Sequence, residues 1–314
     1  MERTWTLWRG YKFGMRKMQK LYKWYVLSLL LMLPSTLLIL WHTQGITAIP
    51  NTCAKLMISL TLLQSASSMS SISCAFNNPC WFLSTLLLLY ALYPLLEHLN
   101  RKFITTRSEA QKYLLIVFVL RLLLLYPFRF IAANSSFDLF AHASPFFRIF
   151  DFEIGILLCY LFVYNTSAPQ HAPITAKKAN GTLAETMVFA LAIGWWIGRN
   201  AILWERYEEV KYTLDIFFAA LLLYVFAFEG GKLSRLFHSQ TLVVLGNISM
   251  YIYIFHFPIV SLLCTQVLGS QSYGSILQPQ ESTLVIALDI ICIAAITYFA
   301  YQFDKKWKTK SNYK

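Results

Sequence analysis

The sequence predicts an all-α protein, a polytopic bundle of transmembrane helices with about eight spans and one further re-entrant or interfacial helix. Hydrophobic residues make up 57% of the 314 residues and charged residues 13%, about half the charged share of a soluble domain. Apolar runs of roughly spanning length recur between short basic clusters. A soluble fold has too little interior to bury this much apolar surface. The chain is therefore predicted to be an integral membrane protein.

Eight apolar runs come close to the length of a membrane-spanning helix, which is about 20 residues. In chain order they are Trp24–Trp41, Trp81–Leu96, Tyr113–Ile131, Phe146–Tyr164, Leu183–Trp204, Leu214–Phe228, Thr241–Cys264 and Thr283–Gln302. A ninth stretch, Ala54–Ile72, is apolar in its first half and Ser-rich in its second.

The basic residues decide whether the ninth stretch crosses the membrane. If it does not, and the N-terminus is cytoplasmic, 20 of the 27 basic residues lie inside, at positions 3–23, 101–112, 177–178, 232–235 and 305–314. If it does, the clusters at 101–112 and 177–178 lie outside. The positive-inside rule therefore favours eight crossings with both termini cytoplasmic. Ala54–Ile72 is then a re-entrant or interfacial helix.

The organisation predicted is one membrane domain, residues 24–303, between basic cytoplasmic segments at 1–23 and 304–314. The net charge of +12 is divided among short clusters, which argues against nucleic acid and favours contact with anionic membrane lipids. Six scattered cysteines without a CxxC pair indicate no metal site. A Cys74–Cys80 disulfide is left open.

Ionisable residues within the spans are the first candidates for a functional site, because they are costly there. Arg121 lies mid-span in YLLIVFVLRLLLLYPF and is expected to pair with Asp151, Glu153 or Asp289; a purely structural ion pair is the alternative. Arg148 and Asp151 share a helix face, although Arg148 lies near the predicted outer end and snorkelling is its alternative.

A second candidate is the segment LGNISMYIYIFHFPIV, in which Gly246, Ser249, Tyr253 and His256 fall on one helix face. Pro258 removes a backbone donor and so frees a carbonyl one turn earlier, as is common where a helix borders a polar cavity. This pattern favours a functional cavity, with a satisfied core histidine as the alternative.

Four segments form an ordered set over residues 11–303. The residues that carry it are Arg16, Lys17 and Lys20; Trp81, Leu83, Ser84, Tyr90 and Pro94; Arg148, Phe152 and Gly155; and Gly246, Ser249, Tyr253, His256 and Pro258. The set resembles the acyltransferase-3 family of polytopic membrane O-acyltransferases. Two positions depart from the family pattern: Lys23 replaces a proline, and Gln302-Phe303-Asp304-Lys305 replaces a Glu-x-Pro element.

The resemblance implies transfer of an acyl group, usually acetyl from acetyl-CoA, to a hydroxyl of a surface polysaccharide or glycolipid. It also implies a multi-pass protein of the bacterial inner membrane, with acyl-CoA as co-substrate and no tightly bound cofactor. Cations at Arg16, Lys17 and Lys20 suit the acyl-CoA polyanion. The other implied substrate-binding residues are Trp81, Ser84, Arg121, Asp151, Ser249 and Tyr253.

The catalytic base stays unassigned, with His256 and Arg148 as the candidate catalytic residues. The family normally opens with two further helices before the basic segment, and the first of them carries its proposed base in an Arg-x10-His element. This pattern occurs in none of the eight apolar runs, so the resemblance implies that the chain lacks these two helices. Slow or absent transfer by the chain as written is therefore expected. A transporter-like or flippase-like protein for saccharide-lipids and a non-catalytic homologue are the alternatives.

Overall fold

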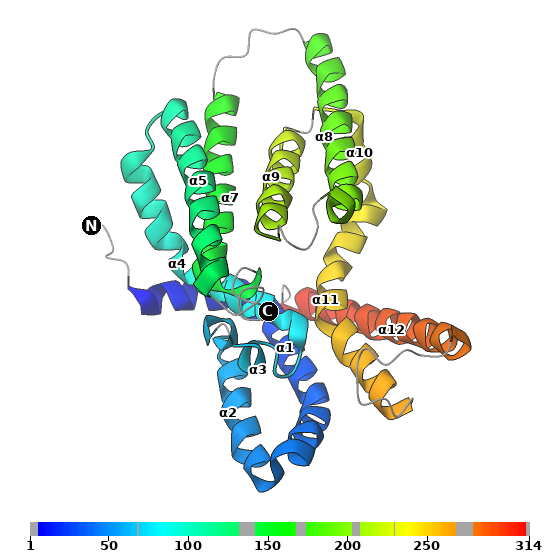
Figure 1. The fold of residues 1–314 in the computed structure, drawn as a ribbon. Helices are drawn as coiled ribbons and strands as arrows, with labels where there is room; N and C mark the ends of the chain where they lie inside the picture. The colour runs from blue at the N-terminus through cyan, green and yellow to red at the C-terminus, as the bar shows by residue number, and fades with distance from the viewer. Residues whose placement is uncertain are drawn as a thin grey trace. The chain divides into compact units, whose positions relative to one another are not determined.

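The computed structural model describes residues 6–67, 69–131, 142–167, 174–202, 208–228, 230–267 and 279–311 (Figure 1). All regular secondary structure within these ranges is helical, which confirms the all-α prediction. The chain divides into two compact units. Unit 1 comprises residues 1–10 and 89–243, and unit 2 comprises residues 11–88 and 244–314.

The long helices follow the apolar runs of the sequence. They are α1 Leu7–Gln44, α4 Trp81–Phe103, α5 Arg107–Ile131, α7 Pro145–Ser167, α8 Ile174–Ile202, α9 Glu208–Phe226, α11 Gln240–Val267 and α12 Pro279–Ser311. Each predicted run lies wholly or largely within one of them, and the end of the fifth run, at Trp204, lies outside the described residues.

Five helical segments in the described part of the chain are long and apolar enough to cross a membrane. They are Trp8–Leu60, Asn78–Phe103, Gly181–Arg199, Gln240–Leu263 and Ile286–Lys306. The chain is therefore a protein of membrane-spanning helices, whereas the count of eight crossings and the orientation of the termini stay predictions.

The stretch Ala54–Ile72, predicted as a re-entrant or interfacial helix, is divided among three helical pieces. Helix α2 (Ala48–Leu60) supplies its first half, and Leu62 then adopts a left-handed conformation with φ of 54°. Two short helical pieces follow, η2 (Gln64–Ser67) and α3 (Ser70–Ser73). Buried hydrogen bonds of Ser65, Ser73 and Ser84 hold the Ser-rich half in a compact, folded segment, and the re-entrant or interfacial placement of the stretch stays a prediction.

Two tyrosine hydroxyls of α1 donate hydrogen bonds to carbonyl groups at the C-terminal end of α2. The hydroxyl of Tyr22 donates to Leu60 O at 2.7 Å, and that of Tyr25 donates to Ser59 O at 2.9 Å. The last carbonyls of a helix have no partner within the helix, so the two tyrosines satisfy them. Tyr25 is fully buried in the process.

The aromatic core of unit 2 joins α1 to α11 and α12. The indole of Trp24 makes edge contacts with Tyr251, Phe255 and Phe303, at centroid distances of 5.8–6.2 Å. Such edge-to-face pairs add about 0.5–1.5 kcal/mol each beyond the burial of area. Aromatic packing therefore fixes the N-terminal half of α1 against the C-terminal helices.

In unit 1, α5 packs against α7, and α9 contacts both of them and α8. One buried cluster contains Ile104, Ala110, Leu157 and Leu161, and a second contains Leu125 and Phe147. Phe147 of the second cluster contacts Arg121, one of the charged residues considered below.

A buried carboxylate joins α8 to the short helix α10 (Lys232–Phe237). Glu185, 1% exposed, accepts hydrogen bonds from the backbone N–H groups of Gly231, Leu233 and Ser234 and from the Ser234 hydroxyl, at 2.6–3.1 Å. A Cβ at position 231 would lie 2.2 Å from this carboxylate. Glycine is therefore required at that position by close approach.

Candidate functional site

The residues predicted to act together fall in both units. Unit 1 contains Arg121, Arg148 and Asp151, and unit 2 contains Arg16, Lys17, Lys20, Trp81, Ser84, Ser249, Tyr253 and His256. The structure therefore provides three local groups of residues, each within a single unit.

The first group is an Arg–Asp–Arg triad between α5 and α7. The Nε of Arg121 donates to Asp151 Oδ1 at 2.6 Å, and Arg148 Nη1 donates to Asp151 Oδ2 at 2.6 Å. Arg121 also reaches Thr213 Oγ1 at 3.0 Å. Of the three partners that the sequence allowed for Arg121, the structure selects Asp151.

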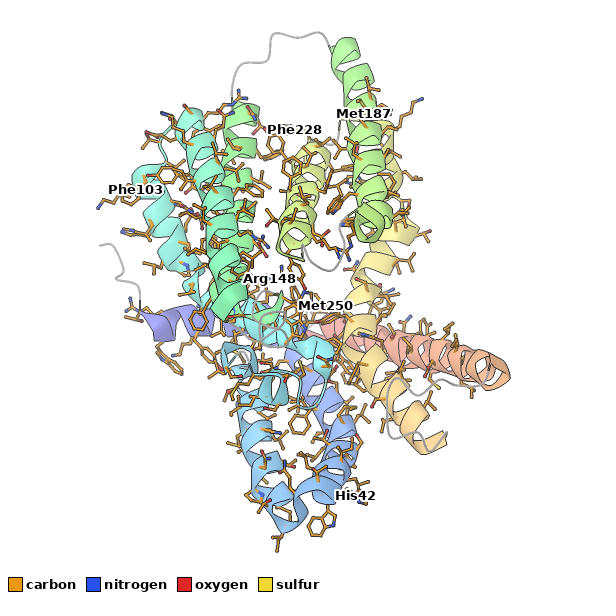
Figure 2. All side chains as sticks on the ribbon, viewed as in Figure 1. His42, Phe103, Arg148, Met187, Phe228 and Met250 are labelled. Carbon is orange, nitrogen blue, oxygen red and sulfur yellow. The ribbon has the colours of Figure 1, made fainter. Side chains whose placement is uncertain are left out.

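Burial distinguishes the two arginines of the triad. The Arg121 side chain is 0% exposed, its guanidinium lies 5.0 Å from the Phe147 ring centroid, and its Nη2 has no hydrogen-bond partner among the described residues. Arg148, near the start of α7 (Figure 2), is 20% exposed, and its Nε donates to His142 O at 2.7 Å. Because one carboxylate serves two guanidinium groups, the triad carries a net positive charge.

The second group is a cation-lined cavity of about 640 Å³ in unit 2. Its lining residues are Arg16, Lys17, Gln19, Lys20, Lys23, Phe303 and Asp304. Four cations thus face one carboxylate. The three basic residues picked out by sequence all lie here, on α1.

Asp304 holds this cavity together, although the sequence analysis did not identify it as a site residue. Its carboxylate, 7% exposed, pairs with the Lys23 ammonium and accepts hydrogen bonds from Trp24 Nε1 at 3.0 Å and the Tyr251 hydroxyl at 2.7 Å. Lys23 is one of the two departures from the family pattern, and Asp304 lies in the other; the two residues contact each other. The sequence could therefore have suggested this pair, because both departures occur in the same chain.

The third group surrounds Pro258, which lies inside α11. Asn77 Nδ2 donates to Ile254 O at 2.8 Å and to Ser28 Oγ at 3.0 Å. Ile254 is the residue whose carbonyl Pro258 leaves without its helical donor. The expected free carbonyl exists, and a buried asparagine satisfies it.

His256 is held in one tautomer by its own helix. Its Nδ1 lies 3.1 Å from Ile252 O and 2.9 Å from Tyr253 O. Carbonyl oxygens only accept, so in the neutral ring Nδ1 carries the proton and Nε2 the lone pair. The half-buried imidazole is therefore arranged to accept a proton at Nε2.

The hydroxyl groups of the other predicted residues of unit 2 are engaged in hydrogen bonds within that unit. Ser84 is fully buried and bonds Leu62 O and the Ser65 hydroxyl, both at 2.8 Å, so it holds the Ser-rich segment. The Tyr253 hydroxyl donates to Pro79 O. Ser249, which is exposed, donates to Gly246 O in its own helix at 2.8 Å.

Trp81, the first residue of α4, makes an edge contact with its neighbour Phe82. Cys74 and Cys80, for which a disulfide was left open, are both free thiols.

The comparisons with known proteins place these groups in context. A family model described as an acyltransferase domain, that of acyltransferase-3, matches residues 6–302. Searches of curated proteins and of solved structures gave no match. Because the family match extends over almost the whole chain, and its helices suit a membrane, the protein belongs to the acyltransferase-3 family and is a membrane acyltransferase.

Proposed function

We propose that the protein moves an acyl group, acetyl in the simplest case, from acyl-CoA to a hydroxyl of a surface polysaccharide or glycolipid. The observation that carries this proposal is the cation-lined cavity of unit 2, where Arg16, Lys17, Lys20 and Lys23 face one carboxylate. Acyl-CoA is a polyanion, and guanidinium and ammonium groups are the usual protein partners of phosphates.

The internal contacts of the cavity support a binding role. The Lys20 ammonium lies 5.6 Å from the Tyr251 ring centroid, and Asp304 is already engaged by three donors. The carboxylate therefore neutralises Lys23, while Arg16, Lys17 and Lys20 keep a surplus of positive charge for a ligand.

The acceptor hydroxyl has a high pKa, so a base must take its proton as it attacks the thioester. In the described residues we assign this role to Nε2 of His256, because its Nδ1 proton is committed to two carbonyls. The nucleophilic oxygen bonds to the acyl carbon, the thiolate of CoA leaves, and the imidazolium returns its proton to that sulfur. A base of this kind contributes about 10²–10⁴ in rate.

The binding step is tested by acyl-CoA-dependent O-acylation in membranes that contain the protein. We expect the variant Lys20→Gln to raise the KM for acyl-CoA roughly fivefold, as about 1 kcal/mol for one exposed cation would give. Lys12→Gln is the matched control, because Lys12 lies on the same helix outside the cavity lining. Equal KM values for both variants would refute the assignment of the cavity to the donor.

The base is tested with His256→Ala in the same assay. We expect a drop in kcat of at least about 100-fold with unchanged thermal stability in detergent. Full activity, or failure to fold, would remove His256 from the mechanism. A second comparison measures the same kcat for a chain extended N-terminally by the family's Arg-x10-His helix. If His256→Ala has little effect in the extended chain, the histidine of that helix and not His256 is the principal base.

A further inference from the structure

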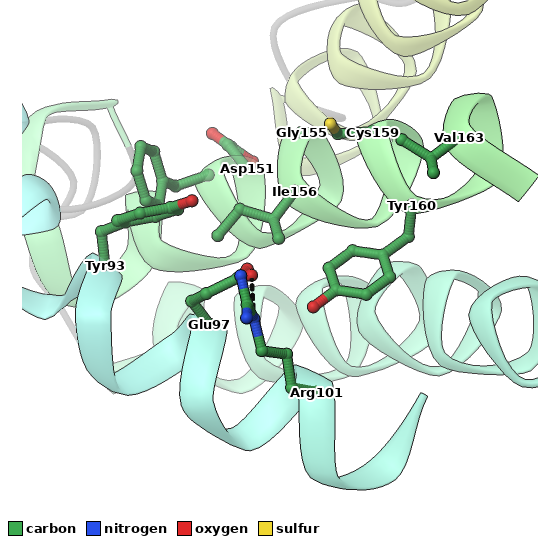
Figure 3. Close-up of a pocket in the computed structure, with 10 residues that line it drawn as sticks. Tyr93, Glu97, Arg101, Asp151, Gly155, Ile156, Cys159, Tyr160 and Val163 are labelled. Atoms are coloured by element: carbon green, nitrogen blue, oxygen red, sulfur yellow. Dashed lines mark hydrogen bonds and ion pairs between the residues drawn. The ribbon is translucent and has the colours of Figure 1, made fainter. Parts of the chain in front are cut away.

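A groove between α4 and α7 in unit 1 has no role in the proposed transfer (Figure 3). Its volume is about 710 Å³, within the range of small-molecule sites. Helix α4 contributes Tyr93, Glu97 and Arg101, which are four residues apart and so share one face. The opposite wall is α7, from Asp151 to Val163.

The body of the groove is apolar and elongated. Along α7 the lining includes Phe152, Gly155, Ile156, Cys159 and Val163, and the 12 steps from residue 151 to residue 163 measure about 18 Å. A Cβ built on Gly155 meets no atom within 4 Å. The groove is therefore open along its floor, and its shape suits a hydrocarbon chain.

The carboxylate at the far end of the groove is not available to a ligand's cation. Both oxygens of Asp151 are occupied by the two arginines of the triad, at 2.6 Å each. Glu97 similarly accepts a 2.7 Å hydrogen bond from Arg101 Nε. The lining thus offers no unpaired negative charge.

The opposite end of the groove contains Arg101, whose Nε is paired with Glu97 and whose side chain is 75% exposed. Its sequence neighbour Lys102, outside the lining, is also exposed. Two further cations, Arg107 and Lys112, lie outside the groove lining at the start of α5. Positions 97–112 thus carry four cations and two carboxylates. The Glu109 carboxylate is held locally by Thr105 and Thr106.

We propose that this groove binds an anionic phospholipid of the surrounding bilayer. One acyl chain lies along the apolar strip of α7, and the phosphate contacts Arg101 and Lys102. Basic pockets between membrane helices on the cytoplasmic side attract anionic headgroups, and the positive-inside rule places residues 101–112 on that side. The groove shares no residue with the cation-lined cavity or with the group around Pro258, although Asp151, Phe152 and Gly155 of its lining belong to the residues singled out by the family resemblance.

The test uses the full chain in nanodiscs of phosphatidylcholine that contain a small fraction of photoactivatable lipid. The probe is phosphatidylglycerol with a diazirine in one acyl chain, and crosslinks are mapped by mass spectrometry. We expect labelling of the α7 segment 151–163 by this probe to exceed labelling by the matching phosphatidylcholine probe at least about fivefold, the effect of about 1 kcal/mol per basic residue.

Two variants and two matched controls decide the outcome. Gly155→Leu fills the groove, whereas Gly194→Leu adds the same side chain at another glycine in unit 1 whose Cβ meets no atom within 4 Å. Arg101→Gln removes the exposed cation, and Arg235→Gln removes an exposed cation of α10. We expect a loss of at least about fivefold in labelling for the first of each pair and no change for the second.

Equal labelling by the two lipids would overturn the choice of an anionic headgroup. Undiminished labelling in folded Gly155→Leu would overturn the site itself. If Gly155→Leu does not fold, Arg101→Gln provides the test, because the Arg101 side chain is largely exposed and its replacement should not disturb folding. Undiminished labelling of Arg101→Gln would then overturn the site. The O-acylation assay on the same variants separates failure of this proposal from failure of the proposed function.

Discussion

Replacing Asp151 by asparagine should destabilise unit 1 far more than an ordinary ion-pair deletion. In the native protein its two oxygens each accept a 2.6 Å hydrogen bond from a guanidinium group. Asparagine keeps one acceptor oxygen but carries no charge, and its NH2 group would face a guanidinium group instead of accepting from it. Arg121, which is 0% exposed and whose Nη2 already has no partner among the described residues, would therefore lose its counter-ion and keep its 3.0 Å bond to Thr213. Leaving a buried charge uncompensated costs about 3–5 kcal/mol.

The same unit supplies a control of matched chemistry. Asp215 also pairs with two donors, Trp195 Nε1 at 2.8 Å and Arg199, but the Arg199 side chain is 36% exposed. Asp215→Asn should therefore cost only about 1 kcal/mol, because water can solvate Arg199 after the change. The two variants differ mainly in the burial of the arginine that is left behind.

The assay is equilibrium unfolding in mixed micelles, followed by a probe in unit 1. The double variant Arg121→Met/Asp151→Asn should recover much of the loss, because the buried charge is removed with its partner. Equal effects of Asp151→Asn and Asp215→Asn, or a double variant as unstable as the sum of its parts, would refute the reasoning.

Three further predictions follow from the topology and from two carboxylates. Cysteine labelling in a cysteine-free background should leave positions 178 and 306 protected from outside reagents, and external labelling of either would contradict the eight-crossing topology. Glu185→Gln should loosen the start of α10, measured as faster hydrogen exchange there, because it removes the charge that accepts four hydrogen bonds. The pKa of Glu109 is lowered from its ordinary value by hydrogen bonds from the backbone and hydroxyl of Thr105 and the backbone N–H of the next residue. The stabilisation of the start of α5 by the ionised Glu109 should thus be complete above about pH 5 and be lost as pH falls through the lowered pKa. Hydrogen-exchange protection factors of the first turn, corrected for the intrinsic pH dependence of exchange, that do not fall on acidification would contradict this.

The sequence by itself determined the fold class and the positions of the long helices. Apolar runs of about 20 residues have few alternatives to a helix in a membrane, because every backbone polar group must be satisfied within the segment. The polar residues within these runs were recognisable for the same reason, since a charge such as Arg121 is costly there unless it is paired. Even the carbonyl freed by Pro258 could be foreseen, because proline lacks the backbone donor.

Only the tertiary structure decided which partners these polar residues have. Asp151 rather than Glu153 pairs with Arg121 because the packing of α5 against α7 brings it within 2.6 Å, whereas Glu153 bonds Asn100 of α4. Asp304 pairs with Lys23, 281 positions away in the sequence. The Ser-rich segment is held in place by a hydrogen bond between the hydroxyls of Ser65 and Ser84. Such contacts depend on how the helices pack against one another. The periodicity of a sequence cannot predict them, because it indicates only which face of a helix is apolar.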